Sequence, residues 1–122
     1  MSIYHLRGER TNRINPIGIQ AIRVEVMNLG NRDFELLLEG FVRGKKVTQL
    51  IQRIPAGSPE PPIIRLKDIA TNGRPFYLKL TTNRFTGDNA RFMIYARKNG
   101  KNVNMFTNVQ LLKEPESGHY LP

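Results

Sequence analysis

The chain of 122 residues has no cysteine. Disulfides, thiolate nucleophiles, iron–sulfur clusters and cysteine-based zinc sites are therefore all excluded. Histidine is scarce, because only His5 and His119 occur and neither lies at HxH or HExxH spacing. We expect both histidines in terminal arms, exposed to solvent, and we expect no metal and no cofactor.

Long apolar runs are also missing. Charged or amide side chains interrupt every hydrophobic stretch well before the roughly 18 residues that a membrane-spanning helix needs, so we expect no membrane insertion. The first residues lead directly into Arg7, Arg10 and Arg13 without an apolar signal-peptide core. The expected location is therefore the cytoplasm, or the outside of the cell by a route other than Sec.

Catalytic groupings are equally scarce. Asp33, Asp68 and Asp88 lie near expected strand ends, but each stands alone, whereas calcium takes six to eight oxygen ligands. Glu35 and Glu39 should point from the same face of one strand, roughly 13 Å apart at about 3.3 Å per residue, wider than a glycosidase pair. No serine lies in a G-x-S-x-G elbow. We therefore expect that the protein is not an enzyme.

Turn residues divide the rest of the chain into short segments. Ten Gly and eight Pro separate stretches in which apolar and polar residues alternate, such as 34–42 and 76–82. The proline-rich run 55–62 predicts an exposed crossover between two sheets. We predict a single domain, an antiparallel seven-stranded β-sandwich of immunoglobulin-like type over residues 16–112, with a small β-barrel as the alternative. Residues 1–15 and 113–122 lack alternation and are predicted to form an N-terminal arm and a mobile C-terminal tail.

The strongest local signal is Asn99-Gly100 between two alternating segments, which predicts a two-residue type I′ hairpin turn. In that register the numbers of facing residues add up to 199. Ala96 then faces Val103 and Ile94 faces Met105, so that these apolar residues point inward. Met93 and Phe106 pair on the outward face.

One stretch resembles a known family. Val24-Glu25-Val26-Met27-Asn28-Leu29-Gly30 fits a V-x-V-x-N-x-G strand end, and Pro55-Ala56-Gly57-Ser58 fits a later P-x-G-S turn. Both are similar to bacterial immunoglobulin-like modules, whose strand rhythm extends over roughly residues 17–112. The resemblance implies a structural or adhesive spacer in a cell-surface, spore or phage assembly.

The charge is strongly basic, with 19 Lys and Arg against 10 Asp and Glu and a net charge of +9. Residues 84–113 hold six basic residues and one acid, so they contribute +5 of this excess. The candidate binding surface is the outward face of the last hairpin: Arg91, Met93, Tyr95, Arg97, Asn104, Phe106 and Asn108.

Two functions fit this surface. The first is a non-enzymatic structural or protein-interaction module, because methionine and aromatic residues are enriched at interfaces. Its partner is another protein or a second copy of the chain. The alternative is binding of single-stranded nucleic acid or another polyanion, with Tyr95 and Phe106 stacking on bases between arginines.

Overall fold

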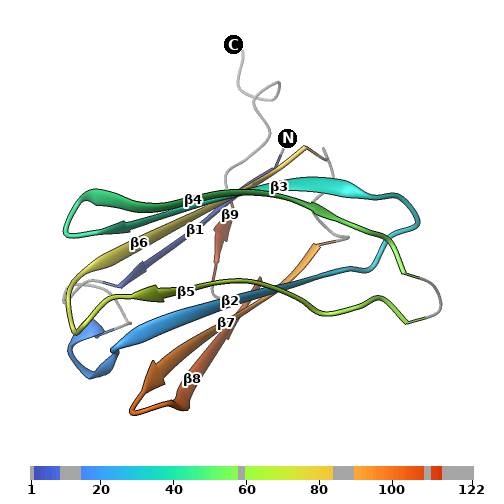
Figure 1. The fold of residues 1–122 in the computed structure, drawn as a ribbon. Helices are drawn as coiled ribbons and strands as arrows, with labels where there is room; N and C mark the ends of the chain where they lie inside the picture. Colours follow the sequence, from blue (N-terminus) through green and yellow to red (C-terminus); the bar gives the residue numbers. More distant parts are fainter. Residues whose placement is uncertain (1, 9–14, 58–59, 84–89, 109–110, 114–122) are drawn as a thin grey trace.

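The computed structural model describes residues 2–8, 15–57, 60–83, 90–108 and 111–113. In these ranges most residues lie in β-strands, with one short 3-10 helix (Figure 1). The elements are β1 (Ser2–Gly8), η1 (Pro16–Gly18), β2 (Ala21–Asn28), β3 (Phe34–Val42), β4 (Lys45–Ile54), β5 (Ile64–Ala70), β6 (Phe76–Thr82), β7 (Ala90–Lys98), β8 (Lys101–Thr107) and β9 (Leu112–Lys113). None of the described helices is long and apolar enough to cross a membrane.

The strands form two antiparallel sheets that lie face to face (Figure 1). Sheet A has the order β4-β3-β6-β1-β9, and sheet B has the order β5-β2-β7-β8. This confirms the expected all-β sandwich, although the described residues form nine strands where seven were predicted. The proline-rich segment after β4 carries the chain from sheet A to β5 of sheet B, as predicted.

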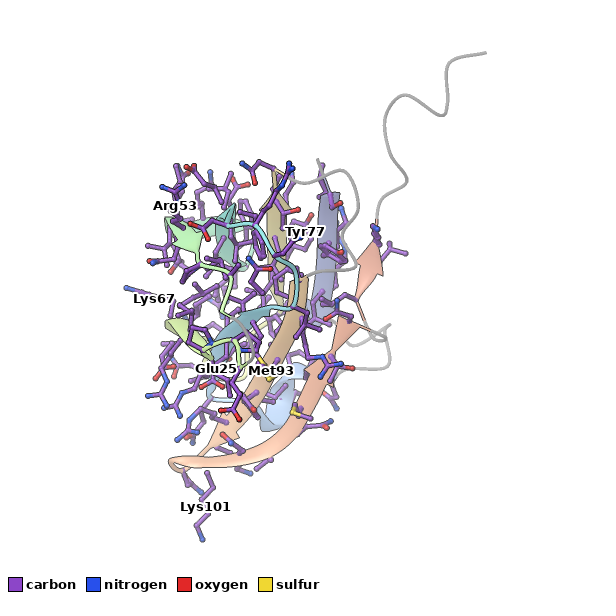
Figure 2. The ribbon with its side chains drawn as sticks, turned by 90° about the vertical axis from the view of Figure 1, so that its right-hand side faces the viewer. Glu25, Arg53, Lys67, Tyr77, Met93 and Lys101 are labelled. Atoms are coloured by element: carbon purple, nitrogen blue, oxygen red, sulfur yellow. The ribbon has the colours of Figure 1, made fainter. Side chains whose placement is uncertain are left out.

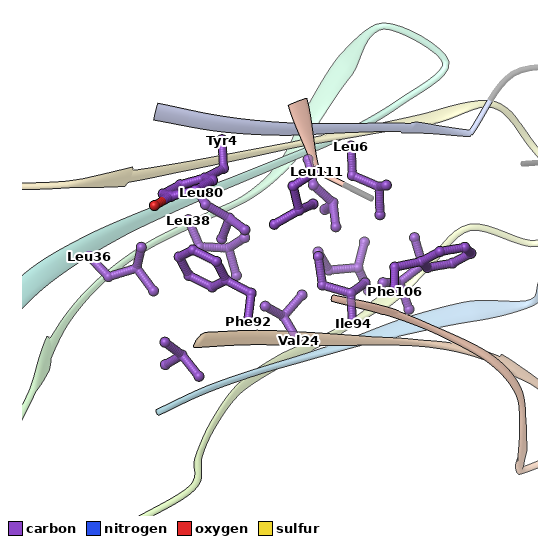
Figure 3. Packing of buried hydrophobic residues seen from close by; sticks show 14 of the residues in the cluster. Tyr4, Leu6, Val24, Leu36, Leu38, Leu80, Phe92, Ile94, Phe106 and Leu111 are labelled. Atoms are coloured by element: carbon purple, nitrogen blue, oxygen red, sulfur yellow. The ribbon is translucent and has the colours of Figure 1, made fainter. Parts of the chain in front are cut away.

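The core fills the space between the sheets (Figure 3). Alternate residues of each inner strand are buried, as in β2, where every second residue from Ile22 to Asn28 is buried. Leu38 and Leu80 of sheet A are fully buried together with Val24 and Ile94 of sheet B. This alternation is the physical basis of the fold, because one apolar face per sheet is removed from water.

Residues 2–8 do not form an arm. They form β1, which pairs with β6 from Ser2↔Thr82 to Gly8↔Phe76 and lies inside sheet A. Tyr4 and Leu6 are buried, and the Tyr4 ring packs edge-on against Phe92 with ring centroids 5.0 Å apart. The prediction was wrong because the two other inward positions are Ser2 and Gly8, which hide the alternation. Lys113 likewise belongs to β9, and the rest of the predicted tail, residues 114–122, lies outside the described residues.

The β7–β8 hairpin turns where predicted but pairs differently. Asn99 and Gly100 both have positive φ, at 53° and 75°, as a type I′ turn requires. The predicted register holds only for Lys98↔Lys101 and Arg97↔Asn102. A β-bulge then inserts Val103, so that Ala96 pairs with Asn104 and Ile94 pairs with Phe106. One extra residue moves every later side chain of β8 to the opposite face.

The β3–β4 hairpin repeats this design. Its turn residues Arg43 and Gly44 also have positive φ, at 55° and 77°. Two residue pairs follow before Val47 bulges, which mirrors the position of Val103 in β8. In each sheet, therefore, one outer strand, β4 or β8, carries a bulged valine near its start.

Three turns meet at one end of the sandwich, on the left in Figure 1. The backbone N–H of Arg43 donates to the Pro75 carbonyl (3.0 Å), which joins the β3–β4 turn to the β5–β6 connection. Gln20 joins that connection to the β7–β8 turn, because its carbonyl accepts from Thr71 N–H (2.9 Å) and its side chain accepts from Asn99 N–H (2.9 Å). We call this end of the sandwich, with the turn segments 43–46, 71–75 and 98–101, the turn end.

Candidate interaction site

The outward face of β7 carries the four residues predicted for it. Arg91, Met93, Tyr95 and Arg97 alternate with the buried Phe92, Ile94 and Ala96. On the neighbouring strand β2, Glu25 faces Met93 (Figure 2). Arg23 of the same strand faces Tyr95. The outer face of sheet B is therefore a mixture of methionine, tyrosine and charged side chains.

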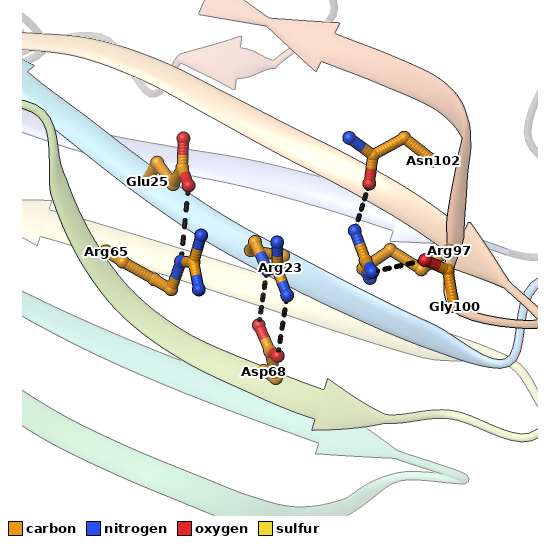
Figure 4. Close-up of polar contacts among 7 residues, drawn as sticks. All are labelled: Arg23, Glu25, Arg65, Asp68, Arg97, Gly100 and Asn102. Atoms are coloured by element: carbon orange, nitrogen blue, oxygen red, sulfur yellow. Dashed lines mark hydrogen bonds and ion pairs between the residues drawn. The ribbon is translucent and has the colours of Figure 1, made fainter.

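Two ion pairs join β2 to β5 on this face (Figure 4). Arg23 donates twice to the Asp68 carboxylate, at 3.0 and 3.3 Å, and Arg65 donates to Glu25 at 3.4 Å. The hydrogen bonds from Arg23 lower the pKa of Asp68, and the positive charges of Arg23, Arg65 and Arg97 act in the same direction against partial desolvation. Arg23 and Arg65 are thus committed to acids of their own sheet.

Three of the predicted binding residues have structural partners. Arg97 donates to Asn102 Oδ1 and to the Gly100 carbonyl, which braces the hairpin turn (Figure 4). Asn108 accepts from Phe92 N–H and donates to the Ala90 carbonyl, both at 2.7 Å, so its side chain continues the ladder beside β7. Asn104 faces Ala96, and its Oδ1 accepts from Met105 N–H (2.8 Å).

Phe106 does not belong to the outward face. It is 6% exposed, faces Ile94 and lies in the core (Figure 3), which corrects the predicted aromatic pair of Tyr95 and Phe106. The Val103 bulge is the cause, since it brings Met105 outward beside Tyr95. Val103 and Met105 are 54% and 47% exposed.

A hollow lies beside these residues. It has a volume of about 450 Å³, and its walls include Leu29, Arg91, Met93, Met105 and Asn108. Leu29 is 45% exposed and Met105 is 47% exposed, so apolar side chains contribute accessible surface to the hollow. The arrangement suits contact with another apolar surface, because methionine adapts its shape to the side chains that it meets.

A second cluster, on the outer face of sheet A, was not predicted from the sequence. The Tyr77 ring stacks on Phe41 and on His5, with centroids 5.5 Å apart in both cases. The Arg7 guanidinium lies 4.2 Å from the Tyr77 ring centroid, and Tyr77 is hydrogen-bonded to His5 Nδ1. These residues come from β1, β3 and β6, so only the strand order brings them together. Outward alternation within each strand was the one available signal.

The acidic residues that were candidates for catalysis or metal binding make hydrogen bonds and ion pairs with nearby residues in the described structure. Asp33 accepts from Ala56 N–H (2.9 Å) and pairs with Arg53, and Glu39 pairs with Lys46 at 2.8 Å. His5 lies in β1 rather than in an arm. Within the described ranges no three His, Asp or Glu side chains gather as a metal site would require. His119 and Asp88 lie outside these ranges.

Comparison with known proteins identifies no family. No protein-family model matches the sequence, and a search of curated proteins finds no match. The functional proposal therefore depends on the surfaces themselves.

Proposed function

We propose that the protein is a non-enzymatic structural module that associates through the outer edge of β8, with a second copy of the chain as its partner. The observation that carries the proposal is the chemistry of this edge. β8 is one of the two outer strands of sheet B, and its residues from Asn102 to Phe106 include no charge and no proline. Val103 and Met105 expose apolar surface along the same edge.

The other outer strands carry the features that discourage pairing between molecules. β4 has Lys45, Lys46 and Arg53, and β5 has Arg65 and Lys67. β9 is only two residues long. Charged side chains and short length are the usual protections of an open sheet edge, because unsatisfied N–H and C=O groups otherwise pair with any extended chain.

A second copy is the occupant that satisfies this edge most simply. Two β8 strands in antiparallel register around a two-fold axis would present the same surface to each other, so each copy covers the edge of the other. The sole charged residue of β8, Lys101, lies at its first position. Antiparallel pairing places the two Lys101 side chains at opposite ends of the shared ladder, so they do not repel.

The test is sedimentation velocity over a range of protein concentrations. Wild type should show a concentration-dependent dimer, and Val103→Lys should weaken it by tenfold or more, because lysine places a charge in the new interface. Val47→Lys is the matched control, since Val47 is the bulged valine of β4 and is 53% exposed against 54% for Val103. A strict monomer at all concentrations, or equal losses in both variants, would contradict the proposal.

The alternative, single-stranded nucleic acid on the outward face of the hairpin, has less support. Burial of Phe106 leaves Tyr95 as the one ring of the predicted set on that face, and Arg97 is bound to its own turn. Membership of a surface, spore or phage assembly stays a prediction from the sequence resemblance.

A further inference from the structure

The turn end of the sandwich is strongly basic. Six cations lie in its three turns: Arg43, Lys45, Lys46, Arg74, Lys98 and Lys101. All six residues are exposed, and Lys101 projects from the tip of its hairpin (Figure 2). The turn segments 43–46, 71–75 and 98–101 contain no acid. The hydrogen bonds that join the turns hold these charges together at one end.

Aromatic side chains lie immediately beside the charges. A hollow of about 210 Å³ opens between Arg7, Phe41, Gly44, Pro75 and Tyr77. Gly44 belongs to the β3–β4 turn and Pro75 to the β5–β6 connection, so two of the basic turns form its rim. Lys46 Nζ lies 5.7 Å from the Phe41 ring centroid and pairs with Glu39 at 2.8 Å, so the remaining turn cations supply the free charge beside the aromatic wall.

We propose that the turn end binds single-stranded nucleic acid, with phosphates on the turn cations and one base in the hollow beside Phe41. Clustered Lys and Arg side chains bind a phosphate backbone by displacing its counterions. An aromatic hollow accepts a base that has left its stack, which a single strand offers and a duplex does not. The site shares only Lys101 with β8, and the variants that test it leave β8 unchanged, so either proposal can fail alone.

A lipid surface is a weaker match for the same charges. The turn tips are Arg43-Gly44, Asn72-Gly73 and Asn99-Gly100, and none presents the large apolar side chain that an interfacial anchor inserts into lipid.

The first test is fluorescence anisotropy of a labelled oligothymidylate at several salt concentrations. Lys46 is paired with Glu39. If the other five turn cations contact phosphates, the slope of log K against log salt should be about −3.5, at about 0.7 per contact. A triple variant, Arg43→Asn with Lys45→Gln and Arg74→Gln, should make this slope shallower by about 2. Asparagine is chosen at Arg43 because that residue has φ 55°, which asparagine tolerates.

A control variant removes the same charge elsewhere. Arg32→Gln with Arg53→Gln and Lys67→Gln lies away from the turn end and should leave the slope within 0.5 of wild type, roughly what residual long-range attraction allows. Equal slope changes in the two triple variants would show that net charge alone is responsible and would overturn the proposal. An affinity for duplex DNA as high as for the single strand would overturn it too.

The base-binding hollow has its own variant. Phe41→Leu keeps an apolar side chain but removes the ring, and it should weaken oligothymidylate binding by roughly fivefold or more. Circular dichroism should show an unchanged fold, since Phe41 is only half-buried on the outer face of sheet A. Unchanged affinity in this variant would refute the stacking contact.

Discussion

Truncation of Phe106 tests the bulged register of β8. In the structure its ring is 6% exposed and faces Ile94, which is fully buried. Removing a buried phenylalanine ring typically lowers the free energy of unfolding by about 3–5 kcal/mol. Because Phe106 lies on an outer strand, we expect a loss at the lower end, about 3 kcal/mol. At roughly 4 °C per kcal/mol for a domain of this size, Phe106→Ala should lower the Tm by about 12 °C.

Met105→Ala is the comparison, because Met105 is 47% exposed and points the other way. We expect a change within about 0.5 kcal/mol, as for other surface substitutions. Urea unfolding followed by far-ultraviolet circular dichroism measures both, since the chain has no tryptophan. The unbulged register would place Met105 against Ile94 and Phe106 outside. A larger loss for Met105→Ala than for Phe106→Ala would therefore refute the bulge. Phe106→Leu, expected to cost about 1 kcal/mol, covers the case in which the alanine variant does not fold.

Three further substitutions test local features. Asn28→Ala should destabilise the fold by about 2–3 kcal/mol in urea unfolding, because this fully buried side chain donates to the Arg32 and Ile54 carbonyls (2.7 and 3.1 Å) and accepts from Gly30 N–H (2.9 Å). Gly8→Ala should cost about 1–3 kcal/mol in thermal unfolding, because a Cβ there would lie 2.1 Å from the buried Phe76 ring; an unchanged Tm would contradict that packing. Asp68→Asn should be less stable than wild type above about pH 4 and equally stable in stronger acid. The pKa of Asp68 is lowered in the fold, so the stability that its carboxylate contributes to wild type disappears as the pH falls through that pKa. Unfolding at several pH values would show this, and a constant difference would refute it.

Local sequence determined much of this fold. The range 34–42 was predicted for β3 and 76–82 for β6, and both match the structure, because each combines regular alternation with turn residues at its ends. The Asn99-Gly100 turn was also found, since few residues other than Asn and Gly adopt positive φ readily.

Features that depend on tertiary contacts were missed. The Val103 bulge has no local signature, because valine also fits regular strands, and its effect on Phe106 appears only when the partner β7 is known. β1 was missed because two of its inward positions hold Ser2 and Gly8, and the contact that calls for a glycine, with the Phe76 ring, is known only from the fold. The basic turn end joins residues from three separate hairpins and connections, whereas charge counting along the chain pointed to residues 84–113 alone.

Hydrogen–deuterium exchange at low and high protein concentration tests the central claim, association through the β8 edge, most directly. Deuterium uptake by peptides that cover residues 101–107 should fall as the concentration rises, because a second copy covers the outer edge of β8 and slows its local opening. Peptides that cover β4, the charged outer strand of sheet A, should not change. Uptake by β8 that is independent of concentration, or protection that appears on β4 instead, would contradict the account.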